Sequence, residues 1–180
     1  PTHNIFWYIL NPFIIIELTG NLHFEGVMIF FLILSLYLLY NNQWKWAGIA
    51  MAASISVKLI PLIFLPLFIQ WFTKRANNKY INDSYTNKLA RLIGFYAIVL
   101  TTVILLFLPF YSAELITNYS KTVALWFQKF EFNASLYYVA RSIGYLFRGY
   151  NEIAIIGKIT PVLVILFILT MTFFRKNLSM

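Results

Sequence analysis

The chain has 180 residues, of which 61% are hydrophobic and only 11% are charged. A soluble domain carries about 25% charged residues, so this composition excludes an ordinary soluble domain and indicates an integral membrane protein. The net charge of +8 is typical of cytoplasmic loops, and no basic-aromatic repeat indicates nucleic-acid binding. The first residue is Pro1, and no charged leader opens the chain, so we expect an internal piece of a longer polytopic protein.

The first apolar segments lie before residue 41. Residues 5–16 are apolar but interrupted by Asn11-Pro12, and they fit either the end of a span or a segment at the membrane interface. Residues 22–40 are predicted to be a span, because about 20 apolar residues cross a hydrocarbon core of roughly 30 Å. Asn21 is predicted as the N-cap of this helix, with Glu25 in the first turn, where the helix dipole favours an anion.

Residues 46–72 have two interpretations. One is a single tilted span with Lys58 in its middle, and the other is a pair of short helices, 46–57 and 59–72, that meet at Lys58. An isolated charge at the bilayer centre costs on the order of 2.5–3.5 kcal/mol by insertion scales, and Pro61 disfavours helical geometry just before it. We therefore favour the pair of short helices, a form that membrane proteins tolerate where protein or a cavity covers the broken backbone.

The rest of the chain alternates between polar loops and apolar spans. Residues 73–88 carry four basic residues against one acidic residue and are predicted to be a cytoplasmic loop, with spans at 89–109 and 153–174. Residues 110–152 then form an outer loop. Two stretches of this loop are predicted to be amphipathic helices that lie in the interface with their aromatic sides down. The first has a helically spaced apolar face, made of Ile116, Tyr119, Val123, Trp126, Phe127 and Phe130, and the second covers residues 134–148.

The segment NPFIIIELTGNLHFEGVMIFFLILSLYLL, followed by VKLIPLIFLPLFI, resembles the GT-C superfamily of polyprenyl-phosphate-sugar-dependent glycosyltransferases, and bacterial mannosyltransferases of that group in particular. Residues 11–69 carry most of the resemblance, and FNASLYYVAR at 132–141 adds a weaker part. The resemblance implies an all-α, multi-pass enzyme of the cell (inner) membrane with its active face on the extracytoplasmic side. It also implies a polyprenyl-phosphate-linked hexose donor, mannose first, and a lipid or glycan acceptor.

Such an enzyme needs cations for the donor phosphate and polar groups for the sugar and the acceptor. Lys58 and Arg141 are the candidate phosphate ligands; the alternatives are a lysine that extends to the membrane surface and an arginine that contacts lipid headgroups. Asn21, His23 and Glu25 are the candidate sugar or acceptor ligands. The alternative for Asn21 and Glu25 is helix capping.

The catalytic base is not assigned by the sequence. The family takes a carboxylate from the first outer loop, whereas Asp83, the chain's one aspartate, lies in the predicted cytoplasmic loop. We therefore expect the base outside this segment, with Glu25 as a weaker candidate. The two-residue spacing of His23 and Glu25 predicts different helix faces, and Glu17 could pair with Lys58.

No cofactor is indicated, because the two histidines, His3 and His23, lie far apart and lack ligand-spaced partners. A divalent metal would need residues from elsewhere in the protein. Two other classes stay open: a secondary transporter or lipid flippase, in which broken helices with charges mark a substrate path, and a non-catalytic membrane scaffold. The sequence shows no clear internal repeat of the kind that a transporter would have.

Overall fold

The computed structural model describes residues 2–20, 23–74, 85–128 and 135–174, and within these ranges all regular structure is helical. The chain divides into two compact units, one ending at Leu108 and the other beginning at Pro109. Each unit is described by itself below.

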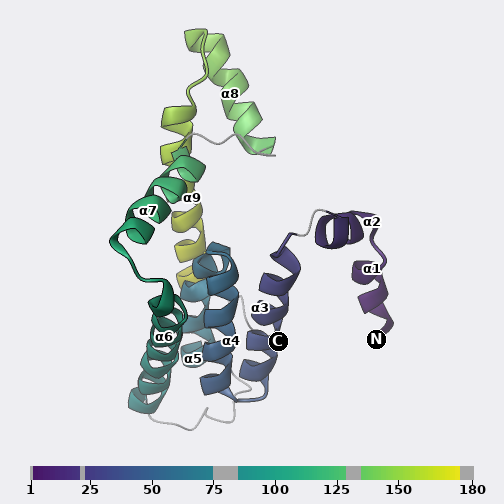
Figure 1. Ribbon diagram of the computed structural model, residues 1–180, viewed down its shortest axis with the longest axis vertical. Helices are drawn as coiled ribbons and strands as arrows, with labels where there is room; N and C mark the ends of the chain where they lie inside the picture. The colour runs from purple at the N-terminus through teal and green to yellow at the C-terminus, as the bar shows by residue number, and fades with distance from the viewer. Residues whose placement is uncertain (1, 21–22, 75–84, 129–134, 175–180) are drawn as a thin grey trace. The chain divides into compact units, whose positions relative to one another are not determined.

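The first unit begins with short helical turns and continues as a helical bundle (Figure 1). Its elements, in chain order, are η1 (Thr2–Asn4), α1 (Ile5–Ile9), α2 (Pro12–Ile15), the π-helical turn η2 (Ile16–Gly20), α3 (Glu25–Tyr40), α4 (Trp44–Val57), the 3-10 helix η3 (Ile60–Leu67), α5 (Phe68–Lys74) and α6 (Tyr85–Phe107). The apolar stretch 5–16 is interrupted at Asn11, whose side chain accepts a hydrogen bond from the Phe13 N–H at 2.9 Å and so caps α2.

Helix α4 packs against both α3 and α6, and most of its buried side chains are small. A Cβ atom on Gly48 would lie 3.0 Å from the Ile98 side chain, so the two backbones approach closely. Two buried hydroxyls join α4 to α3: Ser35 donates to the Ala47 carbonyl at 2.9 Å, and Ser54 donates to the Met28 carbonyl at 2.7 Å. Small residues and interhelical hydrogen bonds of this kind hold membrane helices together.

Aromatic side chains fill the space between α5 and α6. Phe95 is fully buried, with its ring centroid 5.3 Å from that of Phe68 and 5.5 Å from that of Phe72. Beside it, the Tyr96 hydroxyl donates to the Leu65 carbonyl at 2.7 Å. The same carbonyl also accepts the backbone N–H of Phe68, so the tyrosine adds a second bond that joins α6 to η3.

The chain reverses direction at Lys58. Helix α4 ends at Val57, and Lys58 has extended backbone angles, φ −149° and ψ 146°. Along α4, Trp44 contacts Gly94 and Gly48 contacts Ile98, so α4 runs in the same direction as α6. The segment after Lys58 returns to the level of Phe95, as the contacts of the aromatic core show. Lys58 therefore lies at the turn of a helical hairpin, near the C-terminal end of α6, and residues 46–72 are not one continuous helix.

The first predicted span differs from the observed helix. Helix α3 begins at Glu25 with Phe24 as its N-cap and has no side-chain cap, so the prediction of Asn21 as the N-cap is wrong. Asn21 itself lies outside the described residues. Glu25 does occupy the first turn, as predicted. Helix α3 has 16 residues, about 24 Å at the usual rise, which is short of a full hydrocarbon core.

Among the described residues, two helical segments are long and apolar enough to cross a membrane, Thr86–Phe110 and Ile153–Phe174. A third would be counted if Pro12–Gly20 and Glu25–Tyr40 were taken together as one bent span. These two helices coincide with the predicted spans 89–109 and 153–174. Their crossing of the membrane, its direction, and the loop assignments of 73–88 and 110–152 stay predictions.

The second unit contains α7 (Ala113–Gln128), α8 (Ser135–Arg148) and α9 (Ile153–Phe174), with the short η4 (Leu108–Phe110) at its junction with the first unit. Helices α7 and α8 each contact α9. Helix α8 ends at Arg148 and is followed by Gly149, whose φ of +74° favours glycine. Arg148 pairs with Glu152 at 3.0 Å. The two helices expected in the outer loop are therefore present. The side chains of Trp126, Phe127 and Phe130 lie outside the described residues, and placement in a membrane interface stays a prediction.

The close approach of α4 and α6 gives the first testable prediction. Gly48→Val should lower the thermal stability of the full-length protein in detergent, because the new methyl groups would meet Ile98 and the Phe95 carbonyl. Overpacking of this kind costs about 1–3 kcal/mol. Ile49→Val, at an exposed position of the same helix, is the matched control and should change the melting temperature little. Equal melting temperatures for both variants would contradict the packing described.

Candidate functional site

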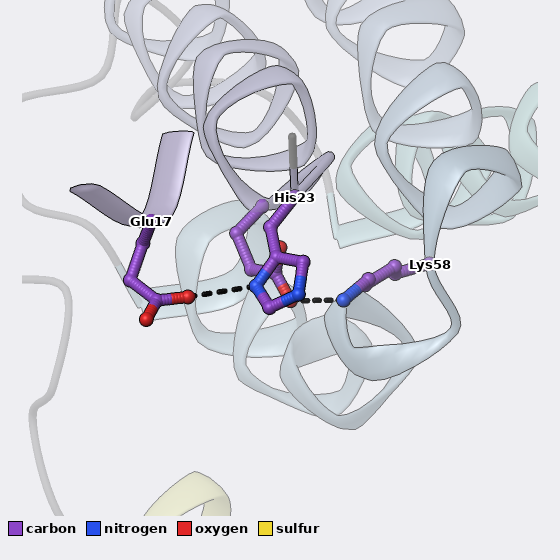
Figure 2. A network of polar contacts seen from close by, with 4 residues as sticks. Glu17, His23 and Lys58 are labelled. Atoms are coloured by element: carbon purple, nitrogen blue, oxygen red, sulfur yellow. Dashed lines mark hydrogen bonds and ion pairs between the residues drawn. The ribbon is translucent and has the colours of Figure 1, made fainter. Parts of the chain in front are cut away.

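Four polar residues meet where α3 begins and α4 ends (Figure 2). Glu17 comes from η2, His23 from the segment just before α3, and Glu25 from the first turn of α3. Lys58 comes from the helix break after α4. We call these four residues the polar cluster.

The contacts of the polar cluster form a chain in which acidic and basic side chains alternate. His23 Nδ1 lies 2.8 Å from Glu17 Oε2 and 3.8 Å from Glu25 Oε2. The other carboxylate oxygen of Glu25 accepts a hydrogen bond from the Lys58 ammonium, and the two groups form an ion pair. The short contact to Glu17 requires a proton on Nδ1 of His23, which leaves Nε2 for another partner.

The backbone explains why the cluster forms. The His23 N–H donates to the Glu17 carbonyl at 3.2 Å, which turns the chain back towards η2. A Cβ atom on Gly26 would lie 2.8 Å from the end of the Leu18 side chain, so the glycine lets this side chain pack closely against the first turn of α3. On the other side, Lys58 is the last residue whose N–H bonds into α4, with Ser54 O at 3.2 Å. Pro61 then supplies no backbone donor.

The polar cluster is partly open. The relative exposures of its four side chains lie between 30% and 47%, so a ligand could reach them. Glu25 Oε2 is an exception, because it is buried and accepts no hydrogen bond from any described residue. A half-exposed ammonium can hold an anion such as a phosphate, and a carboxylate with a spare lone pair can accept a proton.

Two contacts differ from the sequence-based predictions. Lys58 pairs with Glu25, and Glu17 faces His23, instead of the predicted pairing of Glu17 with Lys58. His23 and Glu25 were predicted to lie on different helix faces, and this is wrong, because His23 precedes the helix and its ring can turn towards Glu25. The sequence did not predict the contact of Glu17 with His23. The one feature of the sequence that indicates this contact is that both residues belong to the same short polar stretch.

The remaining predicted site residues are not part of the described cluster. Asn21 and Asp83 lie outside the described residues. Arg141 belongs to α8 of the second unit, where its guanidinium lies 4.7 Å from the centre of the Tyr138 ring. The neighbouring Tyr137 hydroxyl donates to Asn151 at 2.9 Å. A phosphate-binding role for Arg141 stays a prediction.

Among the described residues, no group of three or more histidine and acidic side chains is arranged to hold a metal ion. The acidic members of the polar cluster are engaged by a lysine and a histidine instead.

The described part of the chain combines apolar helices with an open polar cluster at helix ends, which fits a membrane protein. The first 75 residues match a family model described as alpha-(1->6)-mannopyranosyltransferase (MptA/B family), N-terminal domain. The match confirms the resemblance to GT-C-type mannosyltransferases and supports glycosyltransferase activity. All four residues of the polar cluster lie inside the matched range. No curated protein and no solved structure matches the chain.

The Glu25–Lys58 pair gives a prediction about stability. A double-mutant cycle with Glu25→Gln and Lys58→Gln, followed by thermal unfolding of the full-length protein, should give a coupling energy of about 0.2–1 kcal/mol, as for a partly exposed pair. The same cycle with Glu25→Gln and Lys45→Gln is the control. Because Lys45 lies near the start of α4 and Lys58 just past its end, the effects should add. Equal coupling in both cycles would show that the pair does not form.

Proposed function

We propose that the protein transfers a hexose, mannose first, from a polyprenyl-phosphate donor to a lipid or glycan acceptor at the extracytoplasmic face of the cell membrane. The observation that carries the proposal is the polar cluster at the helix break, which lies inside the segment that matches a mannosyltransferase domain. The family description names a mannopyranosyl group, which supports mannose over other hexoses.

In this proposal each member of the cluster has one role. The Lys58 ammonium holds the donor phosphate and stabilises the charge that it gains when it leaves. The Glu25 carboxylate is the candidate base that takes the proton of the acceptor hydroxyl. His23, held by Glu17, hydrogen-bonds to the sugar or the acceptor through Nε2.

The group transfer is a single displacement. The acceptor oxygen attacks the anomeric carbon of the sugar, and its proton passes to the carboxylate. A bond from the acceptor oxygen to the anomeric carbon forms while the bond from that carbon to the phosphate oxygen breaks. The electron pair leaves with the polyprenyl phosphate, beside the lysine. No further reactant is needed.

The position of the cluster in the bundle supports an outward-facing site. Lys58 lies near the C-terminal end of α6, whereas the turn between α3 and α4, at Asn41–Gln43, lies at the opposite end of the bundle (Figure 1). The basic loop 73–88 precedes α6 and is the predicted cytoplasmic segment. With that loop on the cytoplasmic side, the cluster would lie on the opposite side of the membrane, which supports the proposal.

The alternatives explain less. A transporter or flippase would account for the broken helix at Lys58, and a scaffold would account for the packing of α3, α4 and α6. Neither accounts for the match to a mannosyltransferase domain.

The activity can be tested with membranes that contain the full-length protein and radiolabelled polyprenyl-phosphate mannose. Lys58→Gln and His23→Ala should each reduce transfer to extractable product at least tenfold, because each removes a ligand or an orienting group. Lys45→Gln removes the same charge from the other end of α4 and should retain wild-type transfer. Wild-type activity in both site variants, at equal expression, would remove the cluster from the active site.

The sidedness can be tested separately. Cysteine is absent from the chain, so Thr19→Cys, beside the cluster, and Asn41→Cys, in the α3–α4 turn, introduce single labelling sites into this segment. A membrane-impermeant maleimide should label position 19 in intact cells, and position 41 only after permeabilisation. Both positions are exposed in the structure, so burial does not prevent labelling. The reverse pattern would place the cluster on the cytoplasmic side and contradict the proposal.

A further inference from the structure

We propose that Glu25 occupies the phosphate site of Lys58 while no donor is bound, and that the donor phosphate displaces it and thereby releases the base. The inference rests on the proposed function and adds to it an order of events. The donor must bind before the carboxylate can act on an acceptor.

The first reason is that the Lys58 ammonium would bind both the Glu25 carboxylate and the donor phosphate. Lys58 is engaged by the Glu25 carboxylate, and the two side chains are 37% and 36% exposed, so a phosphate can approach the ammonium from outside. A phosphate bound there would place a second negative charge beside the carboxylate. Like charges at such short range repel, and the repulsion is strong where the surroundings are only partly hydrated. Phosphate binding therefore favours the departure of Glu25 from the lysine.

The second reason is the state of the other carboxylate oxygen. Glu25 Oε2 is buried and accepts no hydrogen bond from the described residues, so in this arrangement an acceptor hydroxyl cannot reach it. A base held in this way is inactive because its free oxygen is covered and its other oxygen is neutralised by a cation. Rotation of the side chain away from Lys58 would remove both restraints.

The third reason is that a second partner stands nearby. His23 Nδ1 lies 3.8 Å from Oε2, too far for a hydrogen bond but within reach of a small side-chain rotation. The ionisable groups that face Glu25 among the described residues are thus Lys58 and His23, with Glu17 behind the histidine. A carboxylate that leaves the lysine can turn towards the imidazole, where it would share the Nδ1–H with Glu17.

The exchange fits the chemistry of the transfer. After displacement, the released carboxylate takes the acceptor proton, the acceptor oxygen bonds to the anomeric carbon, and the electron pair of the broken bond leaves on the phosphate oxygen beside Lys58. When the polyprenyl phosphate departs, Glu25 loses its proton to solvent and pairs again with the lysine. The carboxylate is thus kept from acting on an acceptor while the donor site is empty.

The test measures binding of a short-chain polyprenyl monophosphate without sugar to the purified full-length protein. Glu25→Gln should bind this probe about 5- to 30-fold more tightly than wild type, because the competing carboxylate is gone. Glu25→Asp, whose shorter side chain reaches Lys58 less well, should also bind more tightly. Glu114→Gln removes a carboxylate from the first turn of α7 and is the matched control, with unchanged binding. Unchanged or weaker binding by Glu25→Gln and Glu25→Asp would overturn the exchange.

Two further readouts separate this inference from the proposed function. Glu25→Gln should lower kcat for mannose transfer while it lowers KM for the donor, and a variant with full turnover would overturn the release of a base. Lys58→Gln should weaken binding of the monophosphate about tenfold. If it does not, while Glu25→Gln still tightens binding, the phosphate site lies elsewhere and the role given to Lys58 in the proposed function fails as well.

Discussion

One constraint shapes the first unit around Lys58: its charge needs a partner or water, and the pairing with Glu25 supplies the partner. A charge within an apolar segment is costly unless it meets a partner or water, and here the chain satisfies both conditions at once. The helix ends one residue before Lys58, so the lysine lies at the turn of a hairpin, and the partner comes from the first turn of the neighbouring helix. The break in the backbone and the ion pair therefore both lower the free-energy cost of placing the Lys58 charge in an apolar segment.

Helix α4 can pack closely against its neighbours because most of its buried side chains are small. Alanine, glycine and serine along its buried faces let α3 and α6 approach its backbone, and buried hydroxyls replace the attraction that apolar side chains cannot supply in lipid. The bulky aromatic residues are placed instead on α5 and α6, around Phe95. Small residues on one side and rings on the other fill the space on both sides of α6.

The sequence predicted those features that follow from the lipid environment. Long apolar runs predicted the helices now called α6 and α9, and a lysine followed by Pro61 predicted the helix break. The start of α3 was predicted wrongly, because the capping preference of Asn21 is local and weak, whereas the described contact there is the packing of Leu18 against Gly26. The contact of Glu17 with His23 depends on the same turn, so no pattern of spacing could have given it.

The hydrogen bond between Ser54 and Met28 has a consequence for the way in which the cluster can open. Ser54 lies one turn before Lys58, and Met28 lies about one turn after Glu25, so this bond fixes the separation of the two helix ends just beneath the ion pair. The bond does not involve the side chains of the cluster, so Glu25 and Lys58 can rotate without breaking it. A ligand that enters here would select among rotamers on a backbone that is already in place, so its entry would lose little conformational entropy.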